Sequence, residues 1–95
     1  MGQQHTLGKV ATSVYTDKID GFTKVVYHST VVVKWDNVKI VLNSGGWRTL
    51  TTKTRMNQAS SQFGLGFGVY QRAGKWFVDY KGEIIDFQDN MILER

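Results

Sequence analysis

The sequence predicts a small α+β domain in which one helix covers an antiparallel sheet, in the order β-β-β-α-β-β-β. Alternating apolar and polar residues mark strands in both halves of the chain, short two-residue turns separate them, and only the middle carries a helical pattern. The 95 residues are expected to form a single domain, 1–95, of about five to six strands with two hairpins. Residues 1–7 are expected to be flexible.

The first hairpin is predicted from two apolar runs that Asp36-Asn37 separates. These runs are TKVVYHSTVVVKW, from Thr23 to Trp35, and VKIVLN, from Val38 to Asn43. Asp and Asn tolerate positive φ, so this pair suits a tight turn. Pairing outward from the turn sets Trp35 opposite Val38 and leaves one face wholly apolar, made of Val31, Val33, Trp35, Val38, Ile40 and Leu42.

A second meander is predicted near the C-terminus, and a weaker strand signal precedes the first hairpin. Phe67 to Arg72, Lys75 to Tyr80 and Glu83 to Phe87 read as strands joined at Ala73-Gly74 and Lys81-Gly82. The core face of this meander would carry Val69, Trp76, Val78, Tyr80, Ile85 and Phe87, with Tyr70 and Phe77 on the reverse face. The N-terminal strand is expected around Lys9 to Tyr15, with DKIDG as its turn.

The helix is predicted between the two hairpins. Met56, Ala59 and Phe63 recur at spacings of three and four, which places them on one narrow apolar stripe. Thr51 or Thr52 is expected to be the N-cap, and Gly64 is placed to end the helix in a left-handed conformation.

Composition excludes several classes of site and segment. The chain has no cysteine, so disulfides, thiolate nucleophiles and thiolate metal sites are excluded. No apolar run approaches the roughly 18 residues of a membrane span, and the N-terminus lacks the apolar segment of a secretory signal. A cytoplasmic protein is therefore expected.

The net charge of +4 is unevenly distributed along the chain. No acid lies between Asp36 and Asp79, whereas this stretch carries six cations: Lys39, Arg48, Lys53, Arg55, Arg72 and Lys75. Such a stretch is either a solvated basic face or a local positive field that favours an anionic partner.

The stretch NSGGWRTLTTKTRMNQ, residues 43–58, is the predicted ligand site, because it leads from a strand through two glycines into the start of the helix. Helix N-termini leave amides without intrahelical acceptors and carry partial positive charge, so phosphate binds there readily. The first turn of a helix favours Asp or Glu, yet Lys53 and Arg55 are expected there. Trp47 or Tyr70 would stack on a base, and the predicted ligand-binding residues are Asn43, Gly45, Gly46, Trp47, Arg48, Thr49, Thr51, Thr52, Lys53, Arg55 and Tyr70.

A purely structural reading of the same stretch stays open, in which the glycines form a turn, Trp47 fills the core and the threonines cap the helix. The spacing is neither that of a Walker loop nor that of a GxGxxG fingerprint. His28 has no carboxylate or nucleophile placed near it in sequence, and His5 lies in the terminus that is expected to be flexible. We therefore expect a protein that is not an enzyme, with no metal and no cofactor.

The motifs VLNSGGWRTLTTKTRMNQ and QFGLGFGVYQRAGKWFV resemble a signature of small phage-encoded proteins, LN-[ST]-GG-[WY]-RT-x-TTK-x-R-[MI]-N followed by a glycine-rich VYQ strand. The resemblance covers about half of the chain, Val41 to Val78. It implies a phage protein that acts in the cytoplasm of the infected bacterial host. Proteins of this kind are also similar to phage sponge proteins, which sequester the cyclic nucleotides that bacterial immune systems make and so block the host's anti-phage defence.

Three functions remain open from the sequence. The first is binding of a small phosphorylated nucleotide, most concretely a cyclic dinucleotide. The second is binding of single-stranded nucleic acid through cations and the aromatic residues Tyr70 and Phe77. The third is inhibition of a host protein through an aromatic surface. A homodimer or higher oligomer is expected in each case, because an exposed strand edge invites pairing and so short a chain has little room to enclose a nucleotide.

Overall fold

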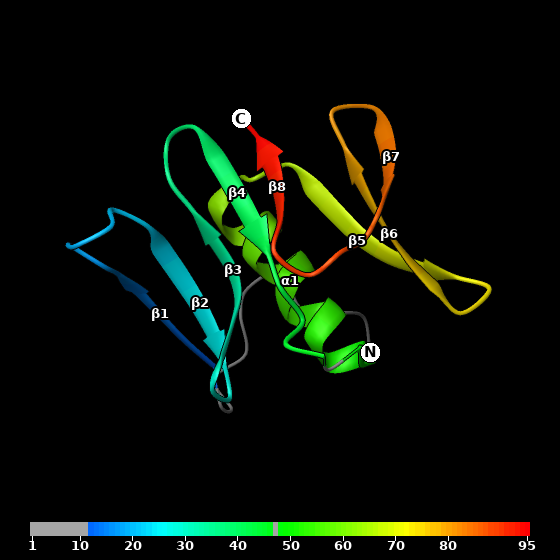
Figure 1. Ribbon diagram of the computed structural model, residues 1–95, viewed down its shortest axis with the longest axis horizontal. Helices are drawn as coiled ribbons and strands as arrows, with labels where there is room; N and C mark the ends of the chain where they lie inside the picture. Colours follow the sequence, from blue (N-terminus) through cyan, green and yellow to red (C-terminus); the bar gives the residue numbers. More distant parts are fainter. Residues whose placement is uncertain (1–11, 47) are drawn as a thin grey trace.

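The computed structural model describes residues 12–46 and 48–95, and it confirms an α+β fold with one helix among antiparallel strands (Figure 1). A five-stranded sheet has the order β1-β2-β3-β4-β8, and a three-stranded sheet has the order β5-β6-β7. The first sheet is formed by β1 (Thr12–Thr16), β2 (Thr23–Tyr27), β3 (Thr30–Trp35), β4 (Lys39–Leu42) and β8 (Met91–Glu94). The helix α1 (Leu50–Phe63) leads to the second sheet, formed by β5 (Phe67–Arg72), β6 (Lys75–Tyr80) and β7 (Glu83–Asp86).

The run from Thr23 to Trp35 is two strands, so the prediction of one continuous strand there was wrong. A turn at His28-Ser29 folds β3 back on β2, and His28 takes the left-handed conformation with φ of 54°. The apolar alternation continues on both sides of this turn, and no glycine or proline marks it. The C-terminal strand β8 is a further strand that the sequence pattern did not indicate, so the described residues contain four strands on either side of the helix.

The predicted core face of the β3–β4 hairpin is correct for Val33, Trp35, Ile40 and Leu42. It is wrong for Val31, because a register shift between β2 and β3 buries Val32 and leaves Val31 half-buried. The predicted β3–β4 register is also wrong. Trp35 lies opposite Ile40, two residues from the predicted partner Val38. The reason is the carboxylate of Asp36, which accepts the Val38 and Lys39 amides at 2.8 and 2.9 Å and draws Val38 into the turn. A shift of two residues preserves the side of the sheet, so Ile40 remains buried while Val38 is exposed.

The β5–β6–β7 meander is confirmed at its predicted turns and core positions. Its predicted core residues are buried except Ile85, which is half-buried, and the reverse-face residues Tyr70 and Phe77 are also half-buried. Of the predicted N-terminal strand, residues 12–15 lie in β1, which extends to Thr16, and residues 9–11 lie outside the described part of the chain, as do residues 1–7.

The helix begins two or three residues before its predicted start, because the N-cap is Thr49 and not Thr51 or Thr52, and it ends where expected. Thr49 is the N-cap, with its hydroxyl accepting the Thr52 amide at 3.2 Å, and Gly64 ends the helix at φ 63° and ψ 38°. The Met56 and Ala59 side chains are fully buried. They belong to one core that joins both sheets, with Val25, Val32, Val33, Trp35, Ile40, Leu42, Leu65, Phe67, Val69, Trp76, Val78, Tyr80, Phe87 and Leu93.

Helix side chains also cover the outer edge of β5. The Asn57 amide group donates to the Val69 carbonyl at 2.8 Å and accepts the Val69 amide at 2.7 Å. The Ser60 hydroxyl makes the same pair of bonds with Phe67, at 2.6 and 3.0 Å. Because an unpaired edge strand leaves amides and carbonyls without partners, these two side chains stand in for a neighbouring strand and join the helix to the second sheet.

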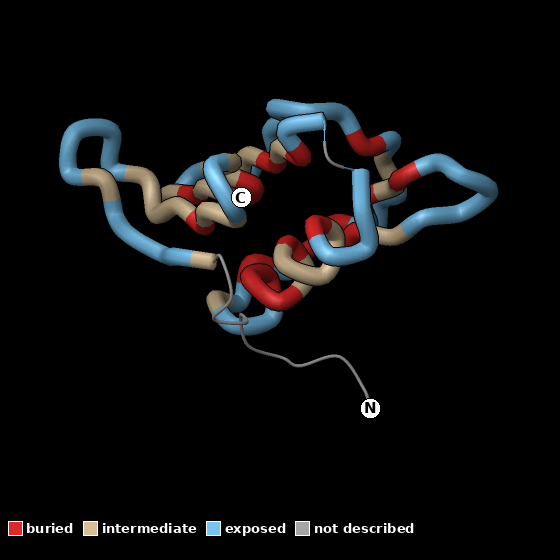
Figure 2. The backbone as a smooth tube through the Cα atoms, turned by 90° about the horizontal axis from the view of Figure 1, so that it is seen from below, coloured by how far each residue is buried: buried red, intermediate tan, exposed pale blue. Residues whose placement is uncertain are grey.

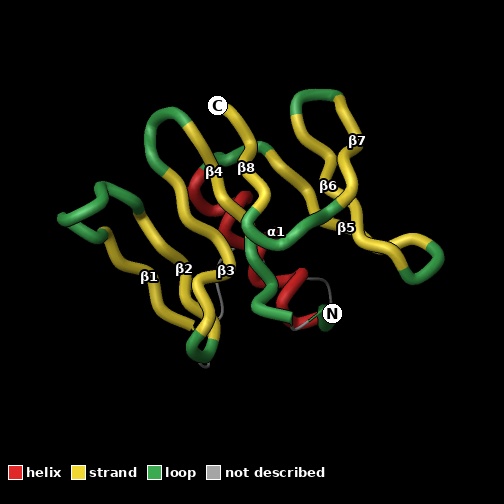
Figure 3. Tube along the Cα trace, in the orientation of Figure 1, coloured by secondary structure: helices red, strands yellow, loops and turns green. Residues whose placement is uncertain are grey.

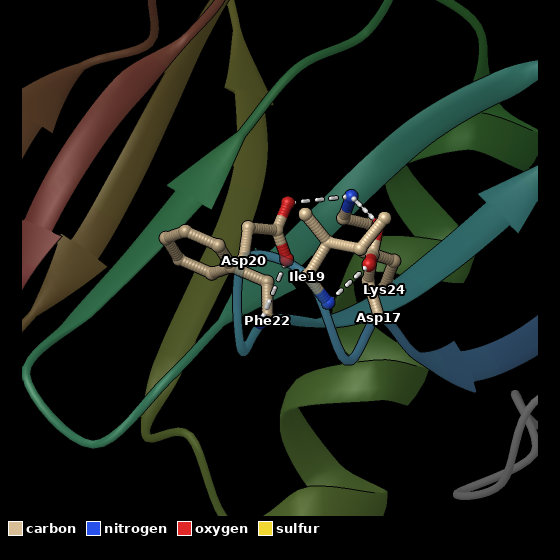
Figure 4. A network of polar contacts seen from close by, with 5 residues as sticks. All are labelled: Asp17, Ile19, Asp20, Phe22 and Lys24. Atoms are coloured by element: carbon tan, nitrogen blue, oxygen red, sulfur yellow. Dashed lines mark hydrogen bonds and ion pairs between the residues drawn. The ribbon is translucent and has the colours of Figure 1, made fainter.

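The turn between β1 and β2 is held by a compact ionic network (Figure 4). Lys24 Nζ lies 3.0 Å from Asp17 and 2.8 Å from Asp20. The Ile19 amide and then Lys24 lower the pKa of Asp17, whereas Lys24 and then the Phe22 amide lower the pKa of Asp20. Figure 2 shows such turns exposed at the ends of the molecule, with buried positions gathered in the helix and the strands.

Candidate functional site

The loop between β4 and α1 contains the glycine turn, residues 43–46, and Ser44 is its buried centre. Its amide and hydroxyl both donate to Asp89 Oδ1, at 2.8 and 2.7 Å, although the two residues lie 45 positions apart. The loop after β4 leads to the N-terminal end of α1. Figure 3 shows that it passes beside the loop that joins β7 to β8. A carboxylate from the C-terminal part of the chain therefore anchors this turn.

The amides of Gly45 and Gly46 are already engaged within the turn. Gly45 donates to Asn43 Oδ1 at 3.0 Å, and Gly46 donates to the Ser44 hydroxyl at 3.2 Å. Both glycines have positive φ, and a Cβ on Gly45 would lie 2.7 Å from the Thr30 side chain. The geometry thus gives these two glycines a turn-forming role and leaves their amides without a free hydrogen for phosphate.

Asp89 also changes the electrostatics of the glycine turn, which is free of acids in the sequence but not in space. Partial burial alone would raise the pKa of Asp89, but hydrogen bonds from the Ser44 hydroxyl and amide, with the charge of Arg48, lower it below its ordinary value. The carboxylate is therefore ionised at neutral pH, and it offsets part of the positive charge of Arg48.

The three cations of the predicted site lie on two sides of the helix. The Arg48 guanidinium stacks over Phe87 and Trp76, with 4.7 and 5.5 Å to the ring centroids, and Lys53 lies 5.8 Å from the Trp76 centroid. Arg55 instead lies 5.6 Å from the Tyr27 ring centroid, on the side of β2. With Thr49 as N-cap, Lys53 is the fourth helical residue and Arg55 belongs to the second turn, so the expected placement of Arg55 in the first turn was wrong.

A cleft of about 650 Å³ lies on the Arg55 side, between the first turn of α1 and the β2–β3 turn. Residues that carry a hydroxyl group dominate its lining, which comes from two stretches of the sequence, residues 27–32 and 44–52. The lining residues are Tyr27, His28, Ser29, Thr30, Val32, Ser44, Thr49, Thr51 and Thr52. The structure therefore brings together the three predicted threonines and adds a wall from β2 and β3 that sequence reasoning missed.

The wall of the cleft carries an aromatic pair next to a cation. The Tyr27 and His28 rings lie 4.4 Å apart with an interplanar angle of 57°, and Arg55 covers Tyr27. Arg55 Nη1 donates to Gln58 Oε1 at 3.1 Å, while its buried Nε has no hydrogen-bond partner within the described structure. The sequence carries no clear signal for this wall, because the turn at His28-Ser29 has no glycine or proline.

Tyr70 does not reach this cleft. It stacks on Phe77, with ring centroids 5.6 Å apart, on the reverse face of the β5–β6 hairpin. Asn43 borders a separate small hollow on the outer face of the first sheet, with Lys24 and Lys34. Trp47 lies outside the described residues.

No group of three or more His, Asp or Glu side chains within residues 12–46 and 48–95 is arranged to hold a metal ion. In the same part of the chain, no helix combines the length and apolar character needed to cross a membrane.

Comparison with known proteins gives one result. The family model described as Kyanoviridae Gp96 protein matches residues 2–94. The chain belongs to this family. Membership in the Kyanoviridae Gp96 protein family confirms the predicted phage origin, whereas the link to cyclic-nucleotide sequestration stays a prediction. No curated protein and no solved structure matches the chain.

Proposed function

We propose that this phage protein binds a small phosphorylated nucleotide in the cleft between α1 and the β2–β3 turn. The observation that carries the proposal is the composition of that cleft. It joins the hydroxyl-rich first turn of a helix to an aromatic pair backed by an arginine, in a volume of about 650 Å³. This volume falls within the range of about 300–1,000 Å³ that is usual for small-molecule sites.

The phosphate would lie against Thr49, Thr51 and Thr52, which line the cleft, although Thr52 is buried and its hydroxyl lies 3.1 Å from that of Thr49. The Thr52 amide is used by the cap, but the amides of Leu50 and Thr51 are first-turn donors without an intrahelical acceptor. The positive end of the helix dipole adds to the attraction for an anion. The phosphate position therefore shifts from the glycine turn to the helix residues that follow it.

The base would lie against Tyr27 and His28, with Arg55 supplying charge from behind Tyr27. Stacking on aromatic side chains contributes about 1–3 kcal/mol per base. In this proposal the protein acts in the cytoplasm of the infected bacterium by sequestration. A bound cyclic nucleotide is withheld from the host's immune receptors, and no chemical step is required.

A second candidate, binding of single-stranded nucleic acid, is favoured by one observation, the stacked Tyr70–Phe77 pair on the other hairpin. This pair lies on the reverse face of the second sheet and does not line the cleft. The two candidates therefore predict different sites and different ligand lengths.

A thermal-shift panel of mononucleotides, cyclic mononucleotides, cyclic dinucleotides and single-stranded oligonucleotides tests the proposal. We expect at least one small nucleotide to raise the melting temperature in a concentration-dependent way, because a ligand bound only to the folded state stabilises it. Stabilisation by oligonucleotides alone would favour the second candidate, and stabilisation by no member of the panel would contradict both.

Arg55→Gln and Lys53→Gln form a matched pair of variants for the panel. The two residues are half-buried cations two positions apart on the same helix, but only Arg55 lies on the cleft side. We expect Arg55→Gln to weaken binding by about 0.5–2 kcal/mol, as for loss of a cation stacked on the aromatic ring that contacts the base, and Lys53→Gln to have little effect. The opposite result would move the site to the Trp76 side, where Arg48 and Lys53 lie.

A further inference from the structure

The two sheets end at β7 and β8 with isoleucines in solvent. In the described structure β7 is an edge strand of the second sheet and β8 is an edge strand of the first. Ile84 on β7 is 65% exposed and Ile92 on β8 is 59% exposed. A single exposed isoleucine is ordinary, but two on neighbouring open edges form a patch that calls for an explanation.

These isoleucines line one shallow groove of about 680 Å³. Its other lining residues are Ile85, Asp86, Gln88 and Met91, so both edge strands and their connecting loop contribute. In Figure 1 both strands lie in the upper half of the view, β8 near the centre and β7 to its right. Near the end of β8, the Glu94 carbonyl accepts hydrogen bonds from Tyr80 at 3.1 Å and Lys81 at 2.9 Å, which holds the two sheets together there.

The charged side chain that lines the groove is the carboxylate of Asp86, although the chain as a whole is basic. Residues 82–94 contain Glu83, Asp86, Asp89 and Glu94 and no Lys or Arg. Asp89 is committed to Ser44, which leaves three carboxylates along the two edge strands. The groove therefore combines exposed aliphatic side chains and open strand edges with the Asp86 carboxylate, while Glu94 has Lys39 opposite it and Lys81 at its carbonyl.

We propose that this groove docks an extended segment of another protein in which apolar and basic residues alternate. An added strand would pair its backbone with an open edge, place its apolar side chains against Ile84 and Ile92, and direct its cations to Asp86 and the other carboxylates. Acidic residues on an edge strand also act as protection against aggregation. That role alone does not account for the isoleucines, because exposed aliphatic residues on an edge promote the pairing that protection prevents.

A fluorescent octapeptide of alternating lysine and valine is the probe, and the assay is anisotropy with the full-length protein. Two control peptides are an alternating glutamate–valine octapeptide and a lysine–valine octapeptide with the same composition in two blocks. We expect binding of the alternating basic peptide alone, weakened by added salt because the charges are exposed.

The protein variants separate the apolar and charged contributions. Ile84→Ser and Ile92→Ser remove exposed apolar groups without adding charge, and each is expected to weaken binding about fivefold to tenfold, as for one buried aliphatic side chain. Asp86→Lys is expected to weaken it by tenfold or more, because it replaces attraction by repulsion. Ile19→Ser is the matched control, since Ile19 is 97% exposed in the distant β1–β2 turn.

Three results would overturn the proposal. The first is equal binding of the alternating and block peptides, which indicates nonspecific attraction. The second is no binding of either basic peptide. The third is a molar mass in light scattering that rises with protein concentration and returns to that of a monomer in Ile92→Ser, which makes a second copy of the chain the occupant.

Discussion

Replacing Asn57 by alanine tests how the helix is joined to the second sheet. The substitution removes two hydrogen bonds, at 2.7 and 2.8 Å, between the Asn57 side chain and the backbone of Val69. Val69 is buried, with 3% of its surface exposed. A typical bond contributes about 0.5–1.5 kcal/mol, and each buried backbone group left without a partner costs about 1–3 kcal/mol. Water can reach part of the strand edge after the substitution, which reduces the cost of the unpaired backbone groups. We therefore expect the free energy of unfolding to fall by about 2–4 kcal/mol.

Urea unfolding followed by tryptophan fluorescence measures this change. The midpoint should fall while the m-value stays the same, because the surface exposed on unfolding hardly changes. Ser61→Ala is the control, since Ser61 is an exposed residue of the same helix, and its effect should stay within about 0.5 kcal/mol. A loss below about 0.5 kcal/mol for Asn57→Ala would refute the argument that helix side chains complete the edge of β5.

Two further predictions concern the glycine turn. Gly45→Ala should destabilise the protein by about 1–2 kcal/mol more than Gly46→Ala in urea unfolding, because both have positive φ but only a Cβ at Gly45 would meet Thr30, at 2.7 Å; equal losses would contradict the close contact. For Asp89, the folded-state pKa lies below the ordinary value of 3.8, so its bonds to Ser44 stabilise the protein above that pH and are lost as pH falls through the folded-state pKa. Asp89→Asn should therefore be less stable than the unsubstituted protein at pH 7, with the gap narrowing towards pH 3, and a gap that does not change with pH would exclude this linkage.

The β5–β6–β7 meander was predictable because the residues of its two turns mark them in the sequence. Ala73-Gly74 and Lys81-Gly82 all take positive φ, the conformation that two-residue hairpin turns require and that glycine favours at the second position. The turn at His28-Ser29 lacks glycine, so the sequence pattern ran through it and two strands were read as one. Likewise, a single side-chain contact from Asp36 moved the register of the first hairpin by two residues, which no pattern of apolar residues encodes.

The candidate site was predicted only in part, because its parts meet through the fold. The threonines of the helix start were found from the sequence, since they precede an apolar helical stripe. Tyr27 and His28 reach the same cleft only because β2 and β3 pack beside α1, and Asp89 reaches Ser44 from the last loop of the chain. The cations Arg48, Lys53 and Arg55 are close in sequence but lie on two sides of the helix. Residues at neighbouring helical positions point in different directions, which separates Lys53 from Arg55.

Mapping of backbone amide shifts by NMR tests the central claim, nucleotide binding in the cleft, most directly. A cyclic dinucleotide and a mononucleotide are each titrated into the labelled protein. The account predicts saturable shifts at residues 27–30 and 49–52, with the Tyr70 and Phe77 amides unchanged. Saturable shifts confined to Tyr70 and Phe77, or no saturable shift with any nucleotide of the panel, would contradict it.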